Sequence, residues 1–128
     1  MMYSSKYYNI KTKTSDGNVF DSSKEARRWE YLLLLLKAGV IFDLQRQVKY
    51  VLIPTQYETY ERYSKTGKRL KDGQRLLEKE CAYYADFVYT LTETGENVVE
   101  DAKGVKTEAY KIKKKLMLAV HSIKIKEV

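Results

Sequence analysis

The chain has 128 residues, with 24 lysines and arginines against 17 aspartates and glutamates, which gives a formal net charge of +7. Its length suits one domain, and 44% apolar residues with a single proline exclude a disordered chain. No apolar run approaches the roughly 20 residues of a membrane helix, and the lone Cys81 cannot form an internal disulfide. We therefore expect one cytoplasmic domain over residues 1–128, whose positive charge suits a polyanionic partner such as nucleic acid.

The first third of the chain predicts a hairpin followed by a helix. Ile10–Thr14 and Val19–Phe20 flank a short sequence rich in turn-forming residues. Ser22 and Glu25 then have the spacing of a capping box, so a helix is expected to begin here and to end before Gly39.

The middle of the chain has the composition of extended structure. Val40–Ile53 is rich in β-branched and aromatic residues and ends at Pro54, which predicts one or two strands. Thr55–Leu76 is polar and rich in tyrosine, and is expected to form a long hairpin arm or a loop. Leu77–Leu91 and Asn97–Lys103 are the strongest strand candidates, joined by a hairpin turn.

The last fifth of the chain holds most of the net charge. Residues 104–128 contain seven lysines against two acids, which leaves +5 of the total +7 in this segment. Apolar residues at steps of three and four predict an amphipathic helix over Glu108–His121. Its expected core face is formed by Ala109, Ile112, Leu116 and Val120. Ser122–Val128 then alternates as a short edge strand does.

Two carboxylates interrupt the strongest predicted strands. Asp86 and Asp101 stand among apolar residues, where burial would penalise an unpaired charge. If the two strands pair across their turn, Asp86 approaches Asp101, and Lys103 shares the face of Asp101. Carboxylates that converge beside a lysine suit a hard cation such as Mg²⁺, while the simpler alternative is a structural ion pair at a strand edge.

These residues, in this order, resemble a known superfamily of nucleases. A first helix with Glu25, the strand acid Asp86, the triplet Asp101-Ala102-Lys103 and a following basic helix resemble the PD-(D/E)XK nuclease superfamily. The chain is more closely similar to a family of small phage and prophage proteins, mostly of unknown function and sometimes described as endonuclease-like or Holliday-junction-resolvase-like. The segments that carry this closer similarity are Phe20–Arg28, Ala85–Tyr89, Val99–Gly104 and Lys106–Thr107 with Tyr110.

The resemblance implies a fold. It implies an α/β restriction-endonuclease-like core, in which a mixed central β-sheet is flanked by helices in the order α-β-β-β-α-β. The N-terminal hairpin and the long hairpin arm would be additions to this core, so residues 1–128 would form a single nuclease-like domain.

The resemblance also implies roles for individual residues. Asp86, Asp101, Glu25 and the backbone carbonyl of Ala102 would bind Mg²⁺ or Mn²⁺, and Lys103 would orient or help to deprotonate the attacking water. A capping box by itself also explains Glu25.

Two positions are ambiguous under this resemblance, and one departs from it. Gln45 matches a helper glutamine of some relatives, with Gln47 as an equal alternative. Glu100 adjoins Asp101, and a slip of one residue would exchange their faces. Ala85 stands where the commonest pattern has proline.

The expected function is therefore that of a Mg²⁺-dependent endodeoxyribonuclease, a hydrolase acting on phosphodiester bonds. Its substrate would be DNA, including branched or recombination intermediates. It would act as a homodimer, encoded by a phage or prophage, in the cytoplasm of the bacterial host. Phosphate contacts would come from Lys106, Lys111, Lys113, Lys114 and Lys115. The alternative is a nucleic-acid-binding module that keeps the fold and the basic surface but does not cut.

Overall fold

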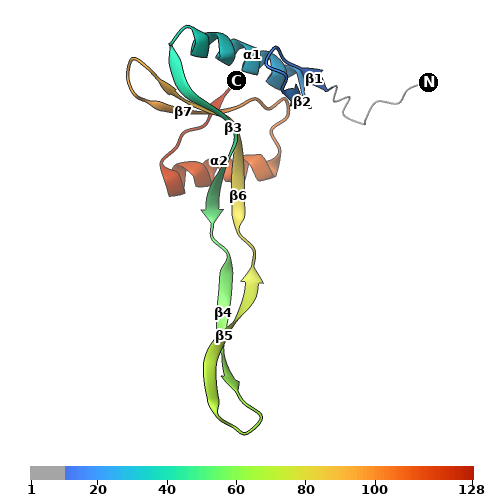
Figure 1. The fold of residues 1–128 in the computed structure, drawn as a ribbon, viewed down its shortest axis with the longest axis vertical. Helices are drawn as coiled ribbons and strands as arrows, with labels where there is room; N and C mark the ends of the chain where they lie inside the picture. The colour runs from blue at the N-terminus through green and yellow to red at the C-terminus, as the bar shows by residue number, and fades with distance from the viewer. Residues whose placement is uncertain (1–10) are drawn as a thin grey trace, which may run out of the picture.

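The computed structural model describes residues 11–128, which contain two helices and eight strands (Figure 1). The helices are α1 (Ser23–Lys37) and α2 (Glu108–His121). The strands are β1 (Thr12–Lys13), β2 (Val19–Phe20), β3 (Ile41–Ile53), β4 (Gln56–Tyr63), β5 (Arg69–Glu78), β6 (Cys81–Leu91), β7 (Asn97–Asp101) and β8 (Lys126–Glu127). Neither helix is long and apolar enough to cross a membrane.

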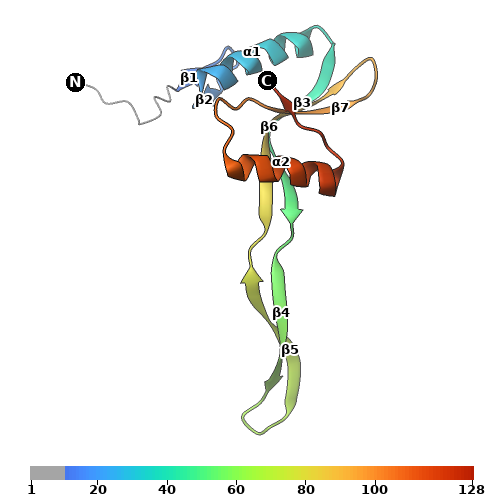
Figure 2. The same cartoon turned by 180° about the vertical axis from the view of Figure 1, so that it is seen from behind.

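A four-stranded mixed sheet lies between the two helices. Its strand order is β3–β6–β7–β8, and β8 runs parallel to β7 while the other neighbours are antiparallel. Phe87 and Tyr89 of β6 pack in the core cluster that contains α1, whereas Val88 packs in the cluster that contains α2. Because side chains alternate along a strand, the two helices cover opposite faces of the sheet (Figures 1 and 2). The prediction of a mixed α/β domain is confirmed.

The N-terminal elements form as the local sequence predicts. β1 and β2 pair as a hairpin, although Ile10, part of the predicted first strand, lies outside the described residues. The hydroxyl of Ser22 caps α1 by accepting the N–H of Glu25 at 3.4 Å. The predicted extended segment 40–53 is a single strand, β3.

Asp16 fastens the N-terminal hairpin to α1. The indole N–H of Trp29 donates to its carboxylate at 2.8 Å. Burial alone would raise the pKa of Asp16, but hydrogen bonds from Thr14, Trp29 and Asn18 lower it to about 2. The ionised carboxylate therefore favours the folded state at neutral pH.

We expect the substitution Asp16→Asn to reduce thermal stability at neutral pH but not in strong acid. Because the pKa is lower in the folded protein than in the unfolded chain, the contribution of Asp16 is complete above about pH 4 and is lost as the pH falls towards 2. Melting temperatures of both proteins between pH 2 and 7 test this. A gap in Tm that stays constant over the whole range would contradict it.

The predicted hairpin arm is present, but one predicted strand is divided. β4 and β5 pair with each other, and β5 runs on to Glu78, so the expected strand 77–91 is in fact two strands. The break falls at Lys79–Glu80, where the N–H of Glu80 donates to the Thr55 hydroxyl at 3.2 Å. The arm therefore forms its own two-stranded sheet and leaves the central one.

The predicted strand 97–103 also ends early, at Asp101. The next N–H, that of Ala102, donates to the carboxylate of Asp86 at 2.8 Å instead of to a neighbouring strand. Ala102 and Lys103 consequently lie just beyond the sheet, beside the predicted site.

α2 has the predicted boundaries but a different buried face. Tyr110 and Met117 are buried, whereas Ile112 and Val120 are 57% and 50% exposed. Tyr110 hydroxyl donates to Glu127 of the returning β8 at 2.9 Å, which fixes the rotation of the helix. The core face is thus displaced by one residue, about 100° around the axis, from the face predicted by periodicity.

Candidate active site

The register of the sheet brings Asp86 and Asp101 together. Phe87 pairs with Glu100, so Asp86 and Asp101 occupy the next position along the same two strands. The pair Val88 and Val99, two positions away along the strands, packs against α2. Because side chains alternate, Asp86 and Asp101 lie on this same side of the sheet. Both aspartates are buried, with 6% and 0% of their surface exposed.

Asp86 is held from two directions. One carboxylate oxygen accepts the backbone N–H of Ala102 at 2.8 Å, and the other accepts the side-chain amide of Gln47 at 3.3 Å. Ala102 thus meets the site through its N–H, and the role expected for its carbonyl stays a prediction.

Asp101 has one satisfied and one unsatisfied oxygen. The hydroxyl of Tyr83 donates to Oδ2 at 2.5 Å. Oδ1 is buried and accepts no hydrogen bond from the described residues, although Lys103 Nζ lies 3.7 Å away. Burial raises the pKa of Asp101, and Asp86 raises it further, against the opposing effects of Tyr83 and Lys103. This carboxylate would be stabilised by additional positive charge.

Lys103 is placed by an aromatic ring as well as by Asp101. Its ammonium lies 5.5 Å from the centre of the Tyr110 ring, within the range of a cation–π contact. Its backbone carbonyl accepts a hydrogen bond from the Lys24 ammonium, in the first turn of α1, at 3.1 Å. The segment after β7 is therefore attached to the N-terminus of α1.

Glu25 lies in the electrostatic field of the aspartates. Burial raises its pKa to about 6, with Asp86 as the next largest cause and Lys103 opposing both. The first-helix acid therefore interacts electrostatically with Asp86 and Lys103, in addition to its position in the helix cap.

Glu100 occupies the opposite face and has a different environment. Arg28 of α1 binds it with two hydrogen bonds of 2.8 and 2.7 Å, and the hydroxyl of Tyr89 donates to it as well. Glu100 is fully buried and fully paired. Of the two neighbouring acids, Asp101 is the one that faces Asp86.

The structure brings Gln47, not Gln45, into contact with Asp86. Gln45 pairs with Val88, while Gln47 falls between the next two pairs, opposite Asp86. The backbone of Gln47 is left-handed, with φ of 51°, a conformation that is strained for this residue type. No local signal in the sequence distinguishes the two glutamines, because the shift in register after Phe42 decides which one faces the aspartate.

A cavity of about 320 Å³ opens at this site. Its lining residues are Gln47, Tyr83, Tyr84, Asp86, Lys103, Thr107, Ala109, Tyr110 and Lys113. Sequence reasoning missed Tyr83 and Tyr110, which lie in separate elements and whose rings are 6.4 Å apart. The strand and helix patterns gave no sign that these tyrosines contact Asp101 and Lys103, and the predicted core face of the second helix did not include Tyr110.

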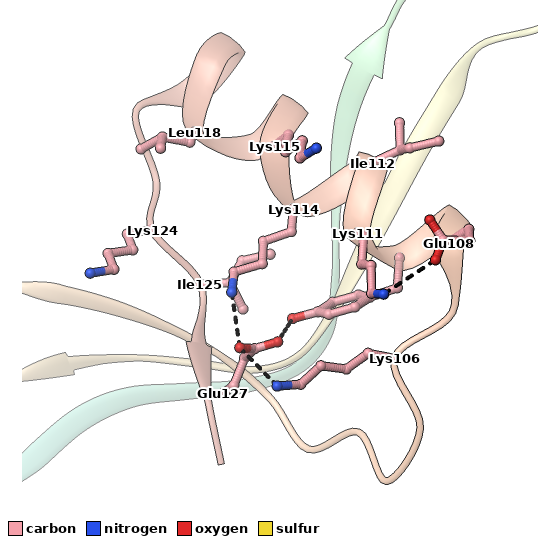
Figure 3. Close-up of a pocket in the computed structure, with 11 residues that line it drawn as sticks. Lys106, Glu108, Lys111, Ile112, Lys114, Lys115, Leu118, Lys124, Ile125 and Glu127 are labelled. Carbon is pink, nitrogen blue, oxygen red and sulfur yellow. Dashed lines mark hydrogen bonds and ion pairs between the residues drawn. The ribbon is translucent and has the colours of Figure 1, made fainter.

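The five lysines predicted to contact phosphate have unequal surroundings. Lys106 and Lys114 both bind Glu127, at 3.3 and 2.9 Å, and Lys111 binds Glu108 at 3.2 Å (Figure 3). Hydrogen bonds from Lys114, Tyr110 and Lys106 lower the pKa of Glu127 to about 2. These three lysines are thus partly neutralised within the molecule.

The other two predicted phosphate contacts are unpaired. Lys113 lines the cavity that contains Asp86 and Lys103, whereas Lys115 lines a separate cavity between α2 and the C-terminal residues 124–127. Neither forms an ion pair with any residue in the described range 11–128. Lys113 is therefore the best placed of the five to meet a ligand at the candidate site.

Residues 4–127 match the model of a family described as a protein of unknown function, DUF1064. The chain belongs to this DUF1064 family. Searches of curated proteins and of solved structures found no match.

The donor chemistry at this DUF1064 site suits a hard cation, although its side chains do not converge fully. Asp86, Asp101 and Glu25 offer only oxygen ligands, and one buried oxygen of Asp101 lacks a hydrogen bond. In the arrangement described for residues 11–128, however, no three acidic, histidine or cysteine side chains lie close enough together to hold one ion. A bound cation would require the Glu25 side chain or a backbone oxygen to complete its shell.

Proposed function

We propose that this DUF1064 chain is a metal-dependent endodeoxyribonuclease whose active site contains Asp86, Asp101, Lys103 and Glu25. The observation that carries the proposal is the buried, unbonded Oδ1 of Asp101, 3.7 Å from Lys103 Nζ. Buried carboxylates with a purely structural role are normally fully hydrogen-bonded. Glu100, the neighbouring residue, meets that standard, so the deficit at Asp101 is not a general property of this strand.

Each side chain has a role in phosphodiester hydrolysis. When bound at these carboxylates, Mg²⁺ or Mn²⁺ supplies charge that polarises a phosphoryl oxygen and acidifies a water. Asp86 and Asp101 would provide the ligand oxygens, and Glu25 and the carbonyl of Ala102 would complete the set. Lys103, held against Tyr110, orients the water for attack, and Lys113 binds a phosphate oxygen in the same cavity.

The resemblance to the PD-(D/E)XK superfamily and to resolvase-like phage proteins extends the proposal to the substrate. It favours branched or recombination DNA, acted on in the cytoplasm of a bacterial host by a phage or prophage protein. One chain has one such site, so cutting both strands of a junction requires two copies, and we propose a homodimer.

Cleavage assays test this function directly. The full chain is incubated with supercoiled plasmid, linear duplex and a synthetic four-way junction, in Mg²⁺, in Mn²⁺ and in excess chelator. We expect nicks or resolved junctions only when the metal is present. If the protein binds these DNAs but cuts none of them with either metal, the nuclease proposal is wrong and the chain is a non-catalytic DNA-binding module.

The two glutamines offer a matched comparison. We expect Gln47→Ala to slow cleavage roughly tenfold, because a residue that positions a metal ligand typically contributes 10- to 100-fold, and Gln47 bonds to Asp86. Gln45→Ala, two residues away on the same strand, should cut at the wild-type rate. Single-turnover rates at saturating protein measure both variants. Equal rates for the two variants would remove Gln47 from the site.

A further inference from the structure

The β4–β5 arm makes no contribution to either core of the protein. It projects away from the body formed by the helices and the central sheet (Figures 1 and 2). Every residue of β4 is exposed, as is every residue of β5 except Gly73, and neither buried cluster includes a residue of the arm. Folding of the domain therefore does not explain why the chain builds a hairpin of this length.

The middle of the arm has contacts between the side chains of its two strands. The Tyr60 ring lies across Gly73, where an added Cβ atom would come within 2.5 Å of the ring, so a larger residue there would have to displace the Tyr60 side chain. The Arg75 guanidinium lies over the same Tyr60 ring, 4.7 Å from its centre, and forms an ion pair with Glu58 at 2.8 Å. An isolated hairpin is marginally stable in water, and these cross-strand contacts stabilise the pairing of β4 with β5.

The charge of the arm is concentrated at its tip. The segment Arg62–Lys71 contains five cations and no acid. These cations are Arg62, Lys65, Lys68, Arg69 and Lys71. Only Arg69 has an ion-pair partner in the described part of the chain, Asp72 at 2.5 Å. The half of the arm nearer the body, by contrast, pairs Arg75 with Glu58.

We propose that the tip of this arm is a second DNA-binding site, which contacts the phosphates of a duplex at a distance from the candidate active site. Unpaired lysines and arginines bind phosphate by releasing condensed counterions, and a two-stranded ribbon is an element that the DNA major groove admits. A tip-to-tip contact between two copies is disfavoured, because it would bring two groups of five cations together. The inference rests on the proposed function in that the partner is DNA, but it does not require cleavage.

The geometry sets the distance between the two sites. Asp86 is nineteen positions after Gly67 at the tip, so the two lie at most roughly 60 Å apart at about 3.3 Å per extended residue. This corresponds to about 18 base pairs of duplex at about 3.4 Å each. A duplex that extends at least this far from the candidate active site can therefore contact both sites.

Salt-dependent binding tests the inference with a charge-matched control. The arm variant is Lys65→Gln with Lys68→Gln, and the control is Arg27→Gln with Lys37→Gln, which removes two exposed cations from α1. Fluorescence anisotropy with a 40-base-pair duplex is measured in chelator, so that no cutting occurs, from about 50 to 300 mM salt. Each lost phosphate contact lowers the slope of log K against log salt by about 0.9, so we expect a decrease of about 2 and a roughly 10- to 30-fold weaker Kd near 0.15 M salt for the arm variant only.

The outcomes separate this inference from the nuclease proposal. If the arm variant binds with the wild-type slope, or the control loses as much as the arm variant, the inference is wrong, whether or not the wild type cuts DNA. If the arm variant loses the expected slope while wild type never cuts, the inference stands and the nuclease proposal fails. Light scattering adds a further check, since dissociation of a wild-type dimer by the arm substitutions would identify the tip as a contact between copies and overturn the proposal.

Discussion

The substitution Asp101→Asn is expected to abolish metal-dependent DNA cleavage without weakening the fold. Asparagine keeps an oxygen for the Tyr83 hydroxyl but removes the charge that would bind the metal. Loss of several kcal/mol of transition-state stabilisation, at about 1.36 kcal/mol per tenfold, corresponds to a roughly thousandfold slower cleavage rate. Rates under single-turnover conditions in Mg²⁺ measure this effect.

The same variant should be at least as stable as the wild type. Burial raises the pKa of Asp101 in the folded protein, so the ionised form opposes folding as the pH rises above its unfolded pKa. Asparagine removes that penalty, and its Tm at neutral pH should equal or exceed that of the wild type. A residue with only a structural role would show the reverse, a lower Tm.

A matched control lies at the other end of the same hairpin. Glu93→Gln removes one negative charge from the exposed turn between β6 and β7, and should leave both cleavage and Tm unchanged. DNA affinity measured in chelator should be retained in Asp101→Asn. If Asp101→Asn cuts DNA at the wild-type rate, this carboxylate is not part of an active site.

The largest loss of stability is expected from Arg28→Ala. This change leaves the fully buried Glu100 carboxylate without its two guanidinium hydrogen bonds and without a compensating charge. Removing one partner of a buried ion pair typically costs about 3–5 kcal/mol of unfolding free energy. Urea denaturation at neutral pH, with the slope of the transition checked for two-state behaviour, gives the value.

Two comparisons isolate the buried ion pair. Arg27→Ala removes the exposed arginine next in sequence and should change the unfolding free energy by less than about 0.5 kcal/mol. The double substitution Arg28→Met with Glu100→Gln removes both charges and should recover much of the loss. A cost of below about 1 kcal/mol for Arg28→Ala would mean that Glu100 is not held by this pair.

Local signals in the sequence were sufficient for most of the elements. The capping box at Ser22 and the turn-forming sequence between β1 and β2 act over a few residues, so they predict boundaries without knowledge of the rest of the chain. The same holds for the limits of α2, from Glu108 to His121. Alternation within the two strands, together with the short turn, also predicted that Asp86 would meet Asp101.

The tertiary structure alone decided how these elements are rotated and which side chains reach the site. The buried face of α2 follows from the contact of Tyr110 with Glu127, which is 17 residues away. Arg28 pairs with Glu100, which is 72 residues away in the sequence. A register shift in β3 places Gln47, and not Gln45, opposite Asp86. Periodicity and spacing describe one element at a time, whereas these choices depend on free energies of packing between elements, which no local pattern contains.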